Sequence, residues 1–360
     1  MGLIRLLLAI SVITAHSSSI FGLNFIQGQM AVEIFFMISG FYMALVLTEK
    51  YNKKSDYKLF ISNRFLKVFP TYWIILILCI IFRFILFKVY PNSSDNIGFL
   101  NSNLHLNFFS FLFLLIPNFT IFGLDFTFFF SLKQSGALFP TLNYTLFYPP
   151  LYDFNFIVQA WTLSLELTFY LFAPFLNRLK SKWLLLIMSL SLGLRLFLYS
   201  RGLYHDPWTY RFFPNELVFF LAGILMYRIY QYIKTKDFKK ISIYIFFFYF
   251  SYLIYYQFLP HERTKQIILF FFSFIFIPLI FNLFKNSKID RFIGELSFPV
   301  YICHFLIIDI FTHFTSLPHQ FLGLTVAIIS IIFSILLSKF IIKPIDHYRQ
   351  SRIKISPMLN

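Results

Sequence analysis

The sequence predicts an all-α fold, a polytopic bundle of membrane-spanning helices. Of the 360 residues, 58% are apolar and only 13% are charged, which lies outside the usual range of soluble domains. Charge-free apolar runs recur along the chain, each about as long as the roughly 17 to 25 residues that cross a bilayer as a helix. Phe alone contributes 55 residues, which is typical of a chain surrounded by hydrocarbon.

About ten segments are predicted to cross the membrane. The first could instead be a secretory signal peptide, but we interpret it as a helix because the polar residues Arg5 and His16 bracket it. The ten segments are residues 4–21, 30–48, 69–87, 159–176, 183–200, 213–231, 241–258, 266–284, 297–314 and 321–342.

Residues 108–130 are also apolar enough to cross, but a single crossing there would invert every later loop. We therefore expect this segment to be re-entrant or interfacial, with its backbone covered by protein. The outward stretch 88–158 carries most of the soluble-looking sequence, including Pro91–Asn96. We expect one membrane domain over residues 1–345, a basic cytoplasmic tail over 346–360, and no attached soluble esterase-like domain.

In this interpretation, the basic residues behind the formal charge of +16 set the orientation of the chain in the membrane. A nucleic-acid-binding protein gathers its basic residues on one soluble face, whereas here they lie between hydrophobic segments. If loops alternate from a cytoplasmic start, most of the 31 Lys and Arg residues fall on the cytoplasmic side. The positive-inside rule then places both termini in the cytoplasm, and the expected partner is the bilayer, with no nucleic acid.

Ionisable residues inside spans are costly, so they are the first candidates for a functional site. The candidates are Arg5, His16, Glu33, Arg83, Glu166, Arg195, Glu216, His304 and Asp309.

Arg5 and His16 lie eleven residues apart, which returns to the same helix face about 16 Å further along the axis. A cation at the membrane surface and a base held deeper would suit an elongated phosphorylated donor that enters from the cytoplasm. In the alternative, Arg5 only sets topology and His16 only packs against other helices.

Three further residues extend this site. Glu33 follows a short loop at a depth comparable to His16, where a carboxylate would fix the imidazole tautomer; it could instead lie at the outer interface. Arg64 and Lys67 are spaced i, i+3 just before Pro70 and could bind phosphates, or could be ordinary juxtamembrane charge.

The segment WTLSLELTFY places Glu166 in the body of the fourth span and Trp161 near its outer end. Glu166 could accept a hydrogen bond from a sugar hydroxyl, or it could form a structural ion pair with Arg83 or Arg195.

Taken together, these positions resemble the acyltransferase-3 family of integral membrane O-acyltransferases, through nearly the whole chain. The most specific element is the basic residue, ten intervening residues and His, matched by Arg5 and His16. The other matching segments, in family order, are GQMAVEIFFMISGF, NRFLKVFPTYW, WTLSLELTFYLFAP and GELSFPVYICHF, which carries Ser297, Tyr301 and His304. Within the second of these segments, Lys67 replaces the family's second Arg. In two departures from the family, the usual Glu before the late proline is absent around Ile342–Pro344 and no periplasmic esterase-like domain is expected.

The resemblance implies transfer of an acyl group, expected to be acetyl, from cytoplasmic acyl-CoA to a hydroxyl of a cell-surface glycan such as O-antigen, exopolysaccharide or a glycolipid. His16 would be the general base or the acyl carrier, and Glu33 would orient it. Arg5, Arg64 and Lys67 would bind the phosphates of acetyl-CoA. The expected acceptor contacts are Trp161, Glu166, Tyr301 and His304, and no metal is expected.

The composition is typical of a bacterial chain, so the expected location is the inner membrane, and the oligomeric state is left open. The rival hypothesis is a non-catalytic glycan exporter or lipid flippase, in which the buried charges line a translocation path.

Overall fold

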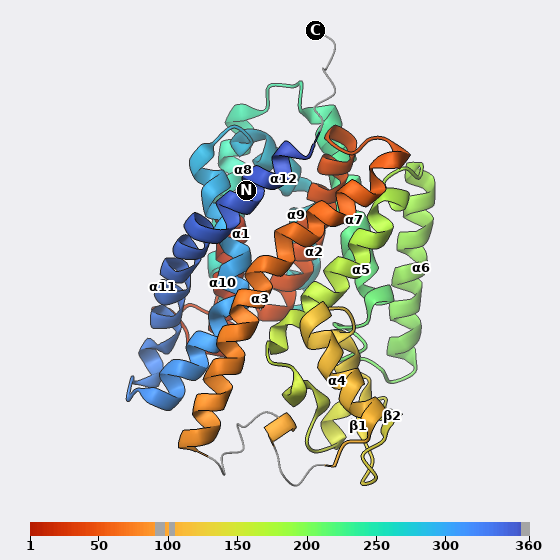
Figure 1. Cartoon of the computed structure of the whole chain (residues 1–360). Helices are drawn as coiled ribbons and strands as arrows, with labels where there is room; N and C mark the ends of the chain where they lie inside the picture. Colours follow the sequence, from red (N-terminus) through yellow and green to blue (C-terminus); the bar gives the residue numbers. More distant parts are fainter. Residues whose placement is uncertain (91–97, 101–104, 354–360) are drawn as a thin grey trace. The chain divides into compact units, whose positions relative to one another are not determined.

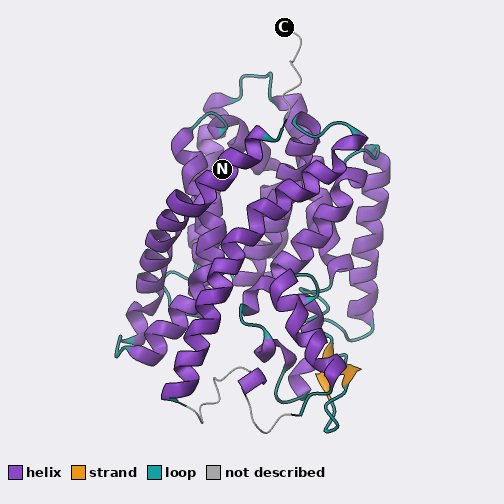
Figure 2. Cartoon of the chain, in the orientation of Figure 1, coloured by secondary structure: helices purple, strands orange, loops and turns teal. Residues whose placement is uncertain are grey.

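A computed structural model describes residues 1–90, 98–100 and 105–353. Pro91–Asn96 and the end of the predicted tail, 354–360, lie outside the described residues. The described chain is almost entirely helical, with one short pair of strands (Figure 2). The all-α prediction is confirmed.

A helix lies at each of the ten positions predicted to cross the membrane (Figure 1). They are α1 (Gly2–His16), α2 (Gly28–Glu49), α3 (Tyr57–Val89), α5 (Trp161–Leu176), α6 (Ser181–Ser200), α7 (Phe213–Ile233), α8 (Lys239–Tyr255), α9 (Glu262–Phe284), α10 (Lys288–Phe314) and α11 (His319–Leu337). Eight of the helical segments are long and apolar enough to span a bilayer, while α1 and α5 have 15 and 16 residues. The described chain therefore has the build of a multi-pass membrane protein.

The first span ends five residues earlier than predicted, because α1 stops at His16. Three serines follow, and serine hydroxyls compete with the helical backbone for hydrogen bonds. Ser17 Oγ donates to the Ile13 carbonyl at 2.6 Å, and Ser18 Oγ accepts from the Gly323 amide at 2.8 Å. His16 is thus the last helical residue and lies next to a turn.

The third helix begins twelve residues before the predicted span, at Tyr57, so Arg64 and Lys67 lie within α3 and not ahead of it. Pro70, which lies near the start of the predicted span, is inside α3. Helix bundles in membranes tolerate such prolines because neighbouring groups satisfy the freed carbonyl.

The last span also continues past its predicted end. A π-helical turn, η8 (Ser338–Ile342), joins α11 directly to α12 (Lys343–Ser351). The first part of the segment predicted as a tail is therefore an ordered helix, which Figure 1 shows as the continuation of α11.

The chain divides into two compact units. Unit 1 comprises Met1–Thr71, Phe172–Met188 and Val218–Asn360, and unit 2 comprises Tyr72–Leu171 and Ser189–Leu217. The single domain over residues 1–345 stays a prediction.

In unit 1, α1 packs most closely against α10 and then against α2 and α11. Glycines permit the tightest crossings. A Cβ on Gly2 would lie 1.7 Å from the Asp290 carbonyl oxygen, and one on Gly223 of α7 would lie 2.1 Å from that of Met37 in α2. These approaches bring backbones together as small residues do in membrane helix pairs.

In unit 2, the predicted re-entrant or interfacial segment begins as a 13-residue helix, α4 (Phe108–Thr120), which spans only about 20 Å. A short 3-10 helix, η3 (Leu124–Phe128), and strand β1 (Phe130–Leu132) follow, and β1 pairs antiparallel with β2 (Leu138–Pro140). Leu114, Leu151 and Phe154 form the buried core beneath α4. A helix this short does not cross a hydrocarbon core of about 30 Å.

Candidate active site

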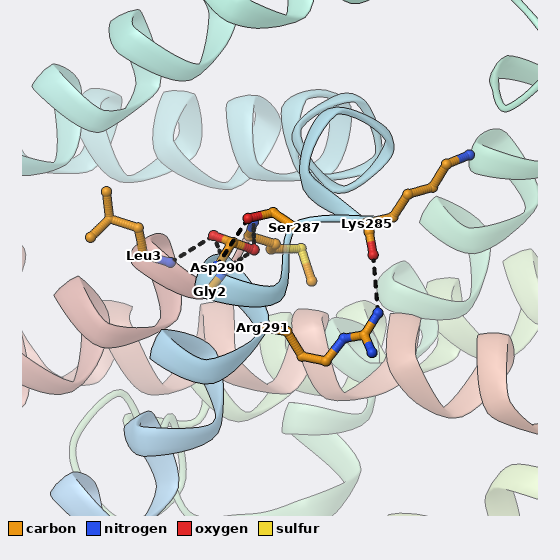
Figure 3. Close-up of polar contacts among 7 residues, drawn as sticks. Gly2, Leu3, Lys285, Ser287, Asp290 and Arg291 are labelled. Atoms are coloured by element: carbon orange, nitrogen blue, oxygen red, sulfur yellow. Dashed lines mark hydrogen bonds and ion pairs between the residues drawn. The ribbon is translucent and has the colours of Figure 1, made fainter. Parts of the chain in front are cut away.

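Helix α1 carries the two ends of the candidate site, Arg5 and His16. The carboxylate of Asp290 fixes the start of this helix by accepting hydrogen bonds from the amides of Gly2, at 2.8 Å, and Leu3, at 3.2 Å (Figure 3). A carboxylate at a helix N-terminus satisfies exposed amides and complements the helix dipole. Asp290 therefore fixes where α1, and with it His16, sits along α10.

His16 meets a second histidine from the predicted set. Its ring stacks on that of His304 of α10, with 5.7 Å between ring centroids and 30° between planes. Phe305 contacts both rings, at 4.7 Å from His16 and 4.8 Å from His304. The His16 side chain is exposed, whereas His304 is fully buried.

The hydrogen bonds of His304 define its tautomer. Nδ1 lies 2.5 Å from the carbonyl oxygen of Tyr301, which can only accept, so Nδ1 carries the proton. Nε2 is then a lone-pair acceptor, and it is buried without a hydrogen-bond partner among the described residues. Tyr301 is also buried and contacts Phe35, 6.3 Å between centroids. Three of the predicted residues, His16, Tyr301 and His304, are thus brought together.

Glu33 lies near the start of α2 and is 1% exposed. Its Oε1 accepts a hydrogen bond from Gln29 Nε2 at 3.1 Å. The start of α2 lies against the end of α1, since a Cβ on Gly28 would be 3.2 Å from that of Ala15. Its action on His16 stays a prediction.

The three predicted phosphate-binding residues form an electrostatic cluster. Lys67 interacts with the charges of both Arg64 and Arg5. Arg64 is 8% exposed and its guanidinium lies over the Phe60 ring, while that of Arg5 lies over the Tyr42 ring, 5.6 Å from its centroid. The Nε atoms of Arg5 and Arg64 are buried without hydrogen-bond partners within the described chain. Such nitrogens suit an anionic ligand.

Two predicted acceptor residues, Trp161 and Glu166, belong to unit 2. The indole of Trp161 contacts Tyr210 and covers the guanidinium of Arg211, 4.3 Å from its centroid. Tyr170 donates a 2.5 Å hydrogen bond to Glu166 Oε1.

Two further ionisable candidates of unit 2 pair with each other, as Arg195 Nη2 binds Glu216 Oε1 at 2.6 Å. Glu216 is fully buried, and a buried carboxylate of this kind requires a cation close by. This pair has the geometry of a structural ion pair.

Unit 2 also holds a buried acid that the sequence reasoning missed. Asp125 Oδ1 accepts a 2.6 Å hydrogen bond from Ser164 Oγ, which in turn accepts from the Gly123 amide. Burial raises the pKa of Asp125 to about 6, and the Ser164 hydrogen bond opposes that rise. Ser164 stands in the WTLSLE segment, but nothing in the sequence near Asp125 signals the contact.

A metal centre has no support in the described residues, where no group of three or more His, Cys, Asp or Glu side chains is arranged to hold an ion.

Comparisons with known proteins agree on one chemistry. Residues 1–343 match the family model described as the acyltransferase domain of the acyltransferase-3 family. A protein of the Acidianus two-tailed virus named "Putative acetyltransferase ORF330" is 28% identical over 175 residues, which cover 46% of this chain. The match covers 53% of that protein, so the chain spans about half the length of this curated relative. No solved structure shows significant similarity to the chain.

The family match covers almost the whole chain, including every predicted site residue, and the viral relative's name points to the same reaction type. A non-catalytic exporter or flippase would not be expected to match in this way. The chain therefore belongs to the acyltransferase-3 family.

Proposed function

We propose that this acyltransferase moves an acetyl group from acetyl-CoA to a hydroxyl of a cell-surface glycan or glycolipid. The observation that carries the proposal is the layout of α1, which has an anion-binding cluster around Arg5 and a histidine pair at His16, about 16 Å apart. An acyl-CoA has the same layout, with phosphates at one end and the thioester at the other.

The orientation of the site follows from the charges of the loops. The positive-inside rule supports a cytoplasmic place for both termini and for the end of α1 that carries Arg5. The phosphates of acetyl-CoA bind there, on Arg5, Arg64 and Lys67, and the thioester extends along α1 to His16. The bacterial inner membrane is the proposed location.

The reaction requires two proton transfers through His16, the formation of a carbon–oxygen bond and the cleavage of a carbon–sulfur bond. His16 takes the proton of the acceptor hydroxyl as its oxygen bonds to the thioester carbonyl carbon. The carbon–sulfur bond then breaks, and the imidazolium returns the proton to the leaving CoA thiolate. In the covalent variant, His16 attacks the thioester first and the acceptor hydroxyl then removes the acetyl group from it.

His304 supports this step because the Tyr301 carbonyl keeps its Nδ1 occupied and because a charged ring would be costly at this fully buried position. A neutral aromatic ring stacked on His16 tolerates the imidazolium that forms, whereas a second cation would oppose it. Glu33 is the proposed carboxylate that favours the charged form of His16.

Acceptor contacts are assigned within each unit separately. In unit 1, His304 stacks on His16 and Tyr301 contacts His304. In unit 2, Trp161 and Glu166 provide an aromatic surface and a carboxylate that suit a sugar ring. In this reading a hydroxyl of the glycan takes the open acceptor position of His304 Nε2.

The test is mass spectrometry of surface glycans from cells that carry the gene, lack it, or carry single variants. We expect a gene-dependent mass shift of one acetyl group that His16→Ala abolishes, because a positioned base contributes about 10² to 10⁴ in rate. His313→Ala is the matched control, since His313 also bonds a carbonyl of α10 but lies about 14 Å further along that helix.

Normal acetylation by a His16→Ala protein present at wild-type level would refute the assigned base. A glycan mass shift that corresponds to a longer acyl group would refute the acetyl assignment but would still support acyl transfer. Acid-quenched protein carrying an acetyl group on His16 would establish the covalent variant.

A further inference from the structure

Helix α12 begins at residue 343, where the family match ends. It docks on α3 at the buried side chain of Asn63. Asn63 Nδ2 donates to the Arg349 carbonyl at 3.4 Å, and Asn63 Oδ1 accepts from Arg352 Nη1 at 2.9 Å. Arg352 Nη2 also donates to Ser62 Oγ at 2.9 Å. Because Asn63 directly precedes Arg64, α12 is held at the turn of α3 that carries the phosphate-binding cations.

The docking buries the side chain of Arg349. The residue is 8% exposed, and its Nη2 pairs with Asp346 at 2.8 Å on the same helix. Its Nη1 is buried without a hydrogen-bond partner among the described residues, as are the Nε atoms of Arg5 and Arg64. A buried guanidinium nitrogen with no acceptor is costly, so three of them in one cluster indicate a missing acceptor.

The charges of the cluster indicate that the acceptor is an anion. Arg349 interacts with the charge of Arg64, and Lys67 interacts with those of Arg349, Arg64 and Arg5. The carboxylates among these neighbours are Asp346 and Glu295, which leaves positive charge in excess. Like charges held together in a partly buried place repel each other unless a ligand of opposite charge neutralises them.

We propose that Arg349 is a further phosphate-binding residue of the donor site, supplied by α12. The inference rests on the proposed acyl-CoA donor and extends it. With Arg5, Arg64 and Lys67, it gives the site enough cations for a donor that carries several phosphates. The site therefore prefers acyl-CoA to a thioester of 4′-phosphopantetheine, which has the same arm and one phosphate.

Steady-state kinetics of the full chain in lipid nanodiscs tests the assignment. Arg349→Ala should raise KM for acetyl-CoA about tenfold or more with kcat unchanged, because a contact to a non-reacting phosphate contributes equally to ground and transition states. KM for S-acetyl-4′-phosphopantetheine should change less than about twofold. Arg349→Lys keeps the charge but loses the bidentate geometry, so its KM for acetyl-CoA should fall between those of wild type and Arg349→Ala.

Lys343→Ala is the matched control, since it removes one exposed cation from the same helix. It should leave both KM values at wild-type level. Unchanged KM values in Arg349→Ala, or equal rises for both donors, would overturn the inference, because α12 would then only support the fold. If Arg349→Ala does not fold, an Arg349→Lys protein with wild-type KM for acetyl-CoA would overturn it in the same way.

Calorimetric titration with CoA separates this inference from the proposed function. A wild-type protein that transfers from neither donor would refute acetyl-CoA as the substrate. CoA binding that weakens about tenfold in Arg349→Ala would still support the phosphate contact, and equal affinities of wild type and variant would refute it.

Discussion

His16 and His304 come from helices at opposite ends of the chain and stack their imidazole rings with 5.7 Å between centroids. The two residues differ in what surrounds them, since His16 is exposed and His304 is fully buried. The Tyr301 carbonyl fixes the tautomer of the buried ring. In the proposed mechanism, the pair therefore combines a base that a substrate can reach with a buried neighbour that positions it.

His304→Phe should lower kcat about 10- to 100-fold and leave KM for the acyl donor unchanged. Phenylalanine keeps the stacked ring, but it removes the Nε2 acceptor that the proposed mechanism offers to the glycan hydroxyl, a loss worth about 1–3 kcal/mol. Steady-state kinetics of purified protein would measure kcat and the donor KM separately, with His313→Phe as control. A rise in donor KM with normal kcat would show that His304 acts on donor binding instead.

The membrane fold could be predicted from hydropathy because each span carries its own signal. A helix lies at each of the ten expected positions. The ends were harder to predict, since α1 stops at His16 through the contacts of Ser17 and Ser18, and one of those partners, Gly323, is distant in sequence. Helix ends set by tertiary contacts have no local signature.

The site was predictable to the extent that its residues stand inside apolar spans, where a charge is conspicuous. His16 and His304 were both found in this way, and the structure brings them together. Arg349 was missed because it lies in a polar segment where one more basic residue is unremarkable. Its burial depends on the docking of α12 on Asn63, a contact across 286 residues of sequence.

Gly223→Ala should destabilise unit 1 by about 1–3 kcal/mol, as overpacking typically does. The added Cβ would lie 2.1 Å from the Met37 carbonyl oxygen and would force α7 away from α2. Thermal unfolding in detergent would show a lower Tm. Gly193→Ala is the control, since its Cβ would meet nothing within 4 Å and alanine favours a helix interior by about 1 kcal/mol. An equal loss of Tm in Gly223→Ala and Gly193→Ala would contradict the close crossing of α7 and α2.

Asp290→Ala should cost about 1–2 kcal/mol of stability and lower acetyl transfer more than that loss alone explains. The carboxylate satisfies the amides of Gly2 and Leu3, and without it the end of α1 loses its anchor on α10 (Figure 3). Ser287→Ala is the control, since it removes a single 3.2 Å hydrogen bond at the start of α10. Activity per folded molecule equal to wild type would show that Asp290 does not position His16.

The stability of the protein should fall as pH rises from about 4 to about 6, because of Asp125. Burial raises the pKa of this carboxyl in the folded protein to about 6, above its value in an unfolded chain. The folded state therefore binds the proton more tightly, so this contribution is fully present below about pH 4 and is lost as pH passes through about 6. Two pKa units correspond to about 3 kcal/mol at most.

Thermal unfolding across that pH range would measure the slope of stability against pH. Three variants test whether Asp125 causes that slope. Asp125→Asn should flatten it, while Asp237→Asn, at an exposed acid, should leave it unchanged. Ser164→Ala removes the hydrogen bond that favours the ionised form, so the pKa of Asp125 should rise further and the loss of stability should extend above pH 6. A wild-type slope in Asp125→Asn would mean that another group titrates there.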